Sequence, residues 1–151
     1  MRKHTKRKHW PTGHMLMPKQ VDSIVMPVHT SLMAIEFGAG TLANRHTLAA
    51  FLNIAGVCAS RMGGTAQETR HALDAAKYAL VDADRRYLST GRIGFNAQQM
   101  RTIRHAITLG DILMRRANSA TVSYAVEWVA QQNDKTPETL GSMDEPMEAA
   151  A

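Results

Sequence analysis

The stretch LANRHTLAAFLNIAGVCASRMGG, residues 42–64, decides how this chain folds. Its apolar residues recur at steps of three and four, which is the spacing of one face of an α-helix. Two glycines close the stretch and predict the end of the helix. We therefore expect a helix over about 42–62 with one buried face, made of Leu48, Phe51, Leu52, Ala55, Cys58, Ala59 and Met62.

A second helix is predicted directly downstream by a capping box, in which a hydroxyl at the helix start pairs with a Glu three residues on. Thr65 and Glu68 fit this pattern. The helix is expected to run to about Ser89, before Gly91 stops it. Its expected inner seam consists of Leu73, Ala76, Leu80, Ala83 and Tyr87.

A third helix is predicted from Asn96 to about Ala117, with Gln99 completing the same capping pattern. Gly110 lies on its apolar seam, where it either allows a close helix crossing or simply weakens the helix by about 1 kcal/mol. The seam residues step by three or four, as in a helix packed on a neighbour, and are Met100, Ile103, Ile107, Gly110 and Met114.

Residues 1–29 are expected to form a basic arm and a linker, because three prolines and a glycine prevent a continuous helix there. Part of the apolar segment 15–28 is nevertheless expected to lie on the core. The first helix is then a short one, SLMAIEFGAG, capped by Thr30 or Ser31.

The segment 120–132 is ambiguous. Alternating Tyr124, Val126 and Trp128 suit a strand, whereas Ala125 and Val129 with their neighbours suit a helix equally well. A lone strand would have no sheet to join, so we predict a helix.

These patterns predict an all-α fold, a compact antiparallel bundle of four or five helices over residues 30–132. A basic N-terminal arm with its linker, residues 1–29, precedes the bundle. An acidic disordered tail, residues 133–151, follows it.

Charge is distributed unevenly along the chain. Residues 1–20 contain six Lys or Arg and no acid, for a net charge of +6. Residues 134–151 contain five acids and one lysine, for −4, and the middle carries +3. Opposite charges at the two ends are typical of interaction segments or solvated ends.

The single cysteine, Cys58, cannot form an internal disulfide, and its place on an apolar helical face predicts a buried, reduced thiol. Pro11, Pro18 and Pro27 interrupt the segment behind the basic start, so it does not fit the apolar core of a signal peptide. No stretch approaches the roughly 18 apolar residues of a membrane span. We expect a cytoplasmic protein without membrane contact.

Three stretches carry a resemblance: the start MRKHTKRKHW, the helix end VCASRMGG and the sequence RRYLSTGRIG. With them the chain resembles small helical proteins encoded by phages and prophages of proteobacteria, over roughly residues 1–10 and 30–130. The resemblance implies a genomic setting and no particular mechanism. The apolar linker 15–28 and the acidic end depart from the pattern, which leaves their roles open.

The arm is the first candidate site. Lys and Arg clusters neutralise phosphates, and five of them engaged on duplex DNA predict a log–log salt slope of about −4 to −5. The aromatic ring at the end of the run could stack on an exposed base. The alternatives are an acidic protein partner and a solvated terminus without a specific role. The arm residues are Arg2, Lys3, Lys6, Arg7, Lys8 and Trp10.

A second candidate is a basic stripe on the outer face of the third helix. It contains Arg101, Arg104, His105, Thr108 and Arg115. The stripe could extend the positive surface of the arm, although an amphipathic helix must in any case place charges outside.

Four charged residues near the end of the second helix are expected to form a solvated, mixed-charge face. They are Asp82, Asp84, Arg85 and Arg86.

No pattern predicts catalysis or metal binding. His4, His9 and His14 recur every five residues, whereas two helical ligands on one face need a spacing of four. A thiol on an apolar face, as at Cys58, has a raised pKa and is a poor nucleophile. Phosphate-binding loops and nucleophile elbows are absent from the sequence. We expect no enzyme activity, no catalytic residue, no metal and no cofactor.

The sequence thus predicts a non-catalytic phage or prophage accessory protein that binds nucleic acid or a host nucleoprotein complex through the basic arm. The alternative is an anti-defence, anti-CRISPR-like protein inhibitor or a helical protein–protein adaptor, whose helical body would bind a host protein. A homodimer formed through the apolar linker 15–28 is compatible with both.

Overall fold

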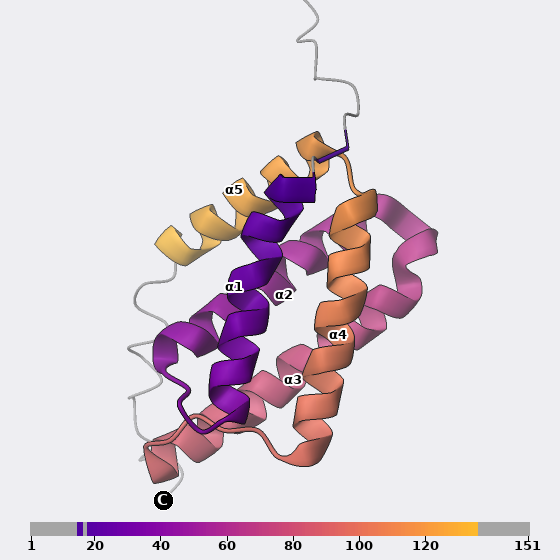
Figure 1. The fold of residues 1–151 in the computed structure, drawn as a ribbon. Coiled ribbons are helices and arrows are strands. Elements are labelled where there is room, and N and C mark those ends of the chain that lie inside the picture. The colour runs from indigo at the N-terminus through magenta and orange to yellow at the C-terminus, as the bar shows by residue number, and fades with distance from the viewer. Residues whose placement is uncertain (1–14, 17, 136–151) are drawn as a thin grey trace, which may run out of the picture.

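The computed structural model describes residues 15, 16 and 18–135, and helices are the regular elements of this part of the chain (Figure 1). The all-α prediction is therefore confirmed. The elements in chain order are α1 (Pro18–Glu36), α2 (Leu42–Met62), the short 3₁₀ helix η1 (Gly63–Ala66), α3 (Gln67–Thr90), α4 (Ala97–Arg116) and α5 (Ser119–Lys135).

Helix α2 is the centre of the fold, because each of the other four α-helices packs on it. Figure 1 shows α1 and α4 side by side in front of α2, with α5 at the upper left of the view. The antiparallel order of the helices stays a prediction. No helix in the described part of the chain combines the length and the apolar character needed to cross a bilayer.

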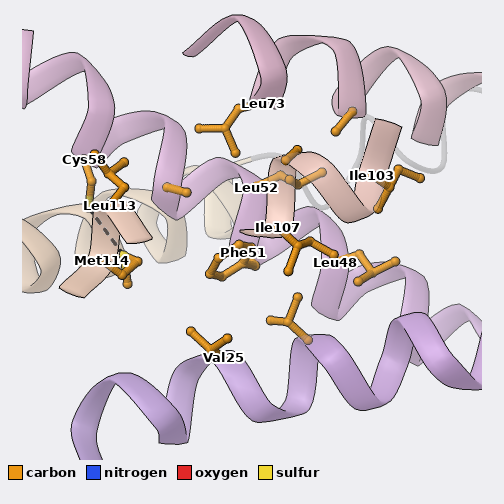
Figure 2. Packing of buried hydrophobic residues seen from close by; sticks show 14 of the residues in the cluster. Val25, Leu48, Phe51, Leu52, Cys58, Leu73, Ile103, Ile107, Leu113 and Met114 are labelled. Carbon is orange, nitrogen blue, oxygen red and sulfur yellow. Dashed lines mark hydrogen bonds between the residues drawn. The ribbon is translucent and has the colours of Figure 1, made fainter. Parts of the chain in front are cut away.

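The predicted apolar face of α2 is confirmed residue by residue, except that Met62 at its end is only half-buried. Figure 2 shows Phe51 and Leu52 between side chains of the flanking helices, with Val25 from α1 and Ile107 from α4 nearby. Burying a Leu or Phe side chain contributes about 1.5–3 kcal/mol. One helix that buries six residues in this way supplies a large share of the stability of the fold.

Gly110 marks the place where α4 crosses α2 closely. A Cβ atom at this position would lie 2.9 Å from Cε1 and 3.0 Å from Cζ of Phe51. The Cβ of Ala55 would be 3.5 Å away. The structure therefore decides between the two interpretations of this glycine: it permits a close crossing.

Helix α1 corrects the prediction of a non-helical linker and of a short helix that begins at Thr30 or Ser31. The helix begins at Pro18, a position that needs no N–H donor, and continues through Pro27. Internal proline costs about 3 kcal/mol. Burial of five apolar side chains on one face outweighs that cost, at about 1.5–3 kcal/mol each; these are Val21, Val25, Val28, Leu32 and Ile35.

The capping prediction is confirmed at α4 and is wrong at α3. Asn96 Oδ1 accepts from the Gln99 N–H at 2.8 Å, and Gln99 Oε1 accepts from the Asn96 N–H at 3.0 Å. Before α3, by contrast, Gly63 has φ +74° and opens η1, which places Ala66 at the N-cap without a side-chain hydrogen bond. The box predicted over residues 65–68 therefore does not open this helix.

Helix α5 confirms the choice of helix for the ambiguous segment. Val122, Ala125 and Val129 are buried, at the i, i+3 and i+7 positions of one face. An isolated antiparallel bridge joins Met15 to Asn118 at the turn between α4 and α5. The chain ahead of α1 is therefore held beside the start of α5.

Candidate functional site

The predicted arm lies outside the described residues, so the structure places only the point at which the chain enters the body. That point is Met15, which forms an isolated bridge with Asn118. Asn118 directly precedes Ser119, the first residue of α5. The arm residues concerned are Arg2, Lys3, Lys6, Arg7, Lys8 and Trp10.

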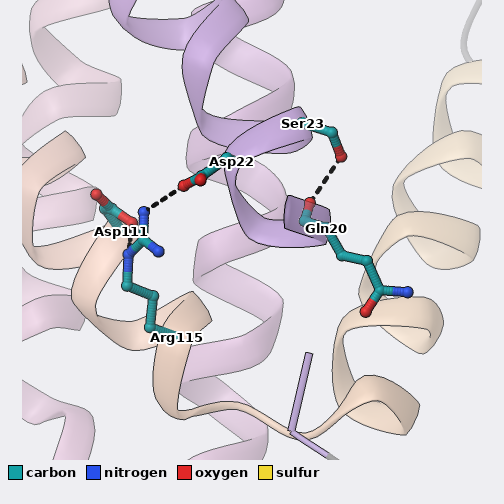
Figure 3. A network of polar contacts seen from close by, with 5 residues as sticks. All are labelled: Gln20, Asp22, Ser23, Asp111 and Arg115. Atoms are coloured by element: carbon teal, nitrogen blue, oxygen red, sulfur yellow. Dashed lines mark hydrogen bonds and ion pairs between the residues drawn. The ribbon is translucent and has the colours of Figure 1, made fainter. Parts of the chain in front are cut away.

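Arg115, from the predicted stripe on α4, is held by two carboxylates (Figure 3). Its guanidinium donates to Asp22 of α1 at 2.8 Å and to Asp111 of its own helix at 2.8 Å. The hydrogen bond to Asp22, helped by Asp111, raises the pKa of Arg115 above its ordinary value. This arginine therefore connects α1 to α4, and its charge is already balanced.

Arg104 makes a second connection of the same kind, with its guanidinium 2.7 Å from Glu36 at the end of α1. Arg101 donates to Gln98 one turn earlier at 2.9 Å, and His105 is exposed. The structure thus brings two of the three stripe arginines to acids of α1. What remains of the stripe is a weaker positive surface than the sequence suggests.

The mixed-charge face predicted near the end of α3 is wrong for Asp84 and Arg86, which are half-buried and connect helices. Arg45 of α2 donates to both carboxylate oxygens of Asp84, through Nε at 2.9 Å. Arg86 donates to Gln99 of α4, whose amide donates to Asp82 at 2.5 Å. Interior arginines with hydrogen-bonded partners of this kind position helices against one another.

A groove of about 440 Å³ is lined by residues of α2, α3 and α5. We call it the basic groove. Its charged and aromatic lining residues are Arg61, Arg70, Asp74, Lys77, Tyr124 and Trp128.

Helical spacing explains how three separate segments line this groove. On α3, Arg70, Asp74 and Lys77 stand at i, i+4 and i+7, so they share one face. On α5, Tyr124 and Trp128 stand at i and i+4. Because both helices pack on α2, these two faces converge on the last two turns of α2.

The cations of the basic groove are not neutralised internally. Arg61 lies over the ring of Tyr124, 4.0 Å from its centroid, in a cation–π contact. Within the described chain, none of Arg61, Arg70 and Lys77 forms a salt bridge. With the single carboxylate of Asp74, the groove has a net charge of +2.

The aromatic side chains of the groove are only partly covered. Tyr124 is 40% exposed and Trp128 is 41% exposed, although both belong to a packed helix. Cations beside accessible aromatic faces bind phosphate groups and stack on planar rings. The arrangement is therefore suited to a ligand that has negative charge and flat rings together.

Sequence reasoning missed the basic groove, although a signal for it is present in the sequence. The 70–74–77 and 124–128 spacings each define a helix face that is charged or aromatic rather than apolar. The two faces meet because α3 and α5 both pack on α2. Neither spacing in the sequence predicts that packing.

Cys58 is buried as predicted, and burial raises the pKa of its thiol from 9.0 to about 11. Its Sγ lies 3.9 Å from Sδ of Met114 (Figure 2). The arrangement is that of a packing residue, since the thiolate needed for nucleophilic attack is disfavoured.

The described residues contain no cluster of three or more His, Cys, Asp or Glu side chains able to hold a metal ion. The predicted histidine series at positions 4, 9 and 14 lies outside them.

Comparisons with protein-family models, curated proteins and solved structures find no match for this chain. The proposals below therefore rest on the residues of the chain itself.

Proposed function

We propose that this protein is a non-catalytic, phage- or prophage-type accessory protein that binds nucleic acid, or a host nucleoprotein complex, through its basic arm and its basic groove. The observation that carries the proposal is the basic groove, where three cations without a salt bridge among the described residues line the same hollow as two partly exposed aromatic rings. Phosphates and bases are the ligands that match both features.

The place where the chain enters the body supports joint action of arm and groove. Met15 is bridged to Asn118, and Tyr124 and Trp128 lie about 9 and 15 Å further along, at 1.5 Å per residue. A ten-residue segment can span up to about 35 Å. Residues 1–10 are therefore long enough to contact the same nucleic-acid strand as the groove.

The stripe on α4 contributes less to this proposal than the arm does. Arg104 and Arg115 have carboxylate partners, and phosphate would have to compete with Glu36 and Asp22 for them. Among the described residues Arg101 forms no salt bridge and donates to the amide of Gln98, so no carboxylate of this part of the chain competes for it.

The test is the affinity of the intact chain for fluorescently labelled oligonucleotides. A double variant, Arg61→Gln with Lys77→Gln, removes two groove charges. Its matched control, Arg85→Gln with Arg92→Gln, removes two exposed charges from outside the groove. We expect the groove variant to lose about tenfold or more in affinity, from two charge-assisted contacts, and the control to lose little. Equal losses in the two variants would contradict a role for the groove.

A second candidate function, an inhibitor or adaptor that binds a host protein, is favoured by a different surface. Met26 and Met33 on α1 are 61% and 54% exposed, and Phe37, the residue directly after the helix, is 77% exposed. Exposed methionines adapt to varied protein partners.

The two functions differ in their response to nuclease and salt. We expect partners captured from a bacterial lysate to be lost after nuclease treatment if nucleic acid is the ligand. A stoichiometric protein complex that persists through nuclease and about 0.5 M salt would favour the adaptor, because exposed ion pairs are screened at that strength.

A further inference from the structure

We infer that the basic groove is a seat for unpaired nucleotides, so that the body of the protein selects single strands while the arm contacts phosphates of any strand. The inference rests on the proposed function and adds to it the class of nucleic acid that the groove recognises.

Ring accessibility is the first argument. Trp128 and Tyr124 are about 40% exposed, and they lie within a groove rather than on a ridge. Paired bases present only their edges, because their faces are stacked on their neighbours. Unpaired bases can leave the stack and lie on aromatic rings or on an arginine guanidinium. Arg61, already stacked on Tyr124 at 4.0 Å, extends this platform.

The cations of α3 give the second argument. Arg70 and Lys77 stand two turns apart, roughly 10 Å along the helix axis, on the wall facing the aromatic residues. Phosphates of a strand lying in the groove would meet them while its bases meet α5. This is the division between a charged wall and a stacking platform that single-strand binding sites use.

Gly56 supports the position of Lys77 in the groove. A Cβ atom at Gly56 would lie 3.0 Å from Nζ of Lys77, tighter than an ordinary contact. The missing side chain therefore leaves room for the ammonium group at the floor of the groove.

An acidic peptide is the competing ligand, and the aromatic residues argue against it. Carboxylates would satisfy Arg70 and Lys77 equally well, but they would leave Trp128 without a partner. A flat ring beside each negative charge is the repeating unit of a nucleic-acid strand.

The experiment uses Trp128 as its own reporter. The chain has two tryptophans, so a Trp10→Phe variant leaves Trp128 as the single one. The full-length variant is titrated with oligo-dT of about 12 nucleotides, within the usual site sizes, and with a duplex of equal length. Trp128 fluorescence reports groove occupancy, and the anisotropy of a labelled strand reports total binding.

We expect oligo-dT to quench Trp128 fluorescence and to bind at least about fivefold more tightly than the duplex, from stacking of one base or more. A second variant, Trp128→Leu, keeps an apolar side chain on α5. It should lose about fivefold in oligo-dT affinity or more, and little in duplex affinity.

Three results would overturn the inference. Strand binding without any change in Trp128 fluorescence would be consistent with nucleic-acid binding through the arm and would exclude the groove as a binding site. Equal affinity for duplex and oligo-dT would show that the groove does not select single strands. Absence of binding to either nucleic acid would overturn both, and would leave an acidic protein segment as the ligand of the cations.

Discussion

At the scale of single residues, Cys58 shows how far an apolar pattern determines chemistry. Its helical spacing predicts a buried thiol, and the structure places it against Met114 with no exposed surface. Burial raises the pKa to about 11, since the thiolate loses hydration and gains little in return.

This shift predicts a loss of stability at high pH. Below pH 9.0 the thiol is protonated in both the folded and the unfolded chain, so its contribution is fully present. As the pH rises towards about 11, the unfolded chain releases the proton while the folded chain retains it, and the contribution is lost. We expect a decrease of about 2 kcal/mol in the unfolding free energy between about pH 8 and pH 10.5.

The control for this measurement is Cys58→Ala, since it retains every other titrating group, including the tyrosines. Urea unfolding of both proteins across the same pH range isolates the thiol. If the difference in unfolding free energy between the two proteins stays constant across this pH range, burial does not raise the pKa of Cys58.

At the scale of elements, sequence reasoning succeeded where periodicity was strong and failed where two local signals competed. The faces of α2 and α4 were predicted correctly from their spacing, except for Met62 and Met100, which are half-buried. The N-terminal half of α1 was missed because Pro27 was taken as a break. Its ring lies on an exposed position of the helix, so the apolar face opposite it stays intact.

The helix starts also show where local sequence patterns fail to predict the structure. At α2, Thr41 accepts from the Asn44 N–H at 3.3 Å and Asn44 Oδ1 accepts from the Thr41 N–H at 2.9 Å, a capping box with Asn in place of Glu or Gln. The usual pattern does not include this pair. At α3 the usual pattern is present, but η1 displaces the start of the helix.

Two glycines of the bundle predict opposite responses to the same change. Gly110→Ala forces a methyl group to 2.9 Å from the Phe51 ring, in the α2–α4 crossing. Overpacking costs about 1–3 kcal/mol, more than the roughly 1 kcal/mol that alanine gains in helix propensity. Gly56→Ala meets only the flexible end of Lys77 and should be neutral or stabilising.

Urea unfolding measures the change in unfolding free energy of both variants, provided that the m-value stays constant. We expect the Gly110→Ala protein to lose up to about 2 kcal/mol, the overpacking cost less the gain in helix propensity. If it equals the Gly56→Ala protein in stability, the close crossing is not a constraint on this fold.

At the scale of the whole molecule, the candidate site divides into a part that the sequence revealed and a part that it did not. The arm is a contiguous run of charge, visible without any structure. The basic groove is formed by α2, α3 and α5, and its charged and aromatic members are up to 67 positions apart, from Arg61 to Trp128. Only the packing of α3 and α5 on α2 brings them together. The packing of α1 against α4 likewise explains why stripe arginines Arg104 and Arg115 are paired with acids of α1.

The salt dependence of oligo-dT binding shows whether the arm and the basic groove bind the same strand together. The measurement compares the intact chain with a variant in which the five arm cations are changed to Gln. Five arm contacts and three groove contacts predict a log–log slope of about −5 to −6 for the intact chain on a single strand, and about −2 for the variant. Equal slopes for the two proteins, or a slope near zero for the intact chain, would contradict joint binding by the arm and the basic groove.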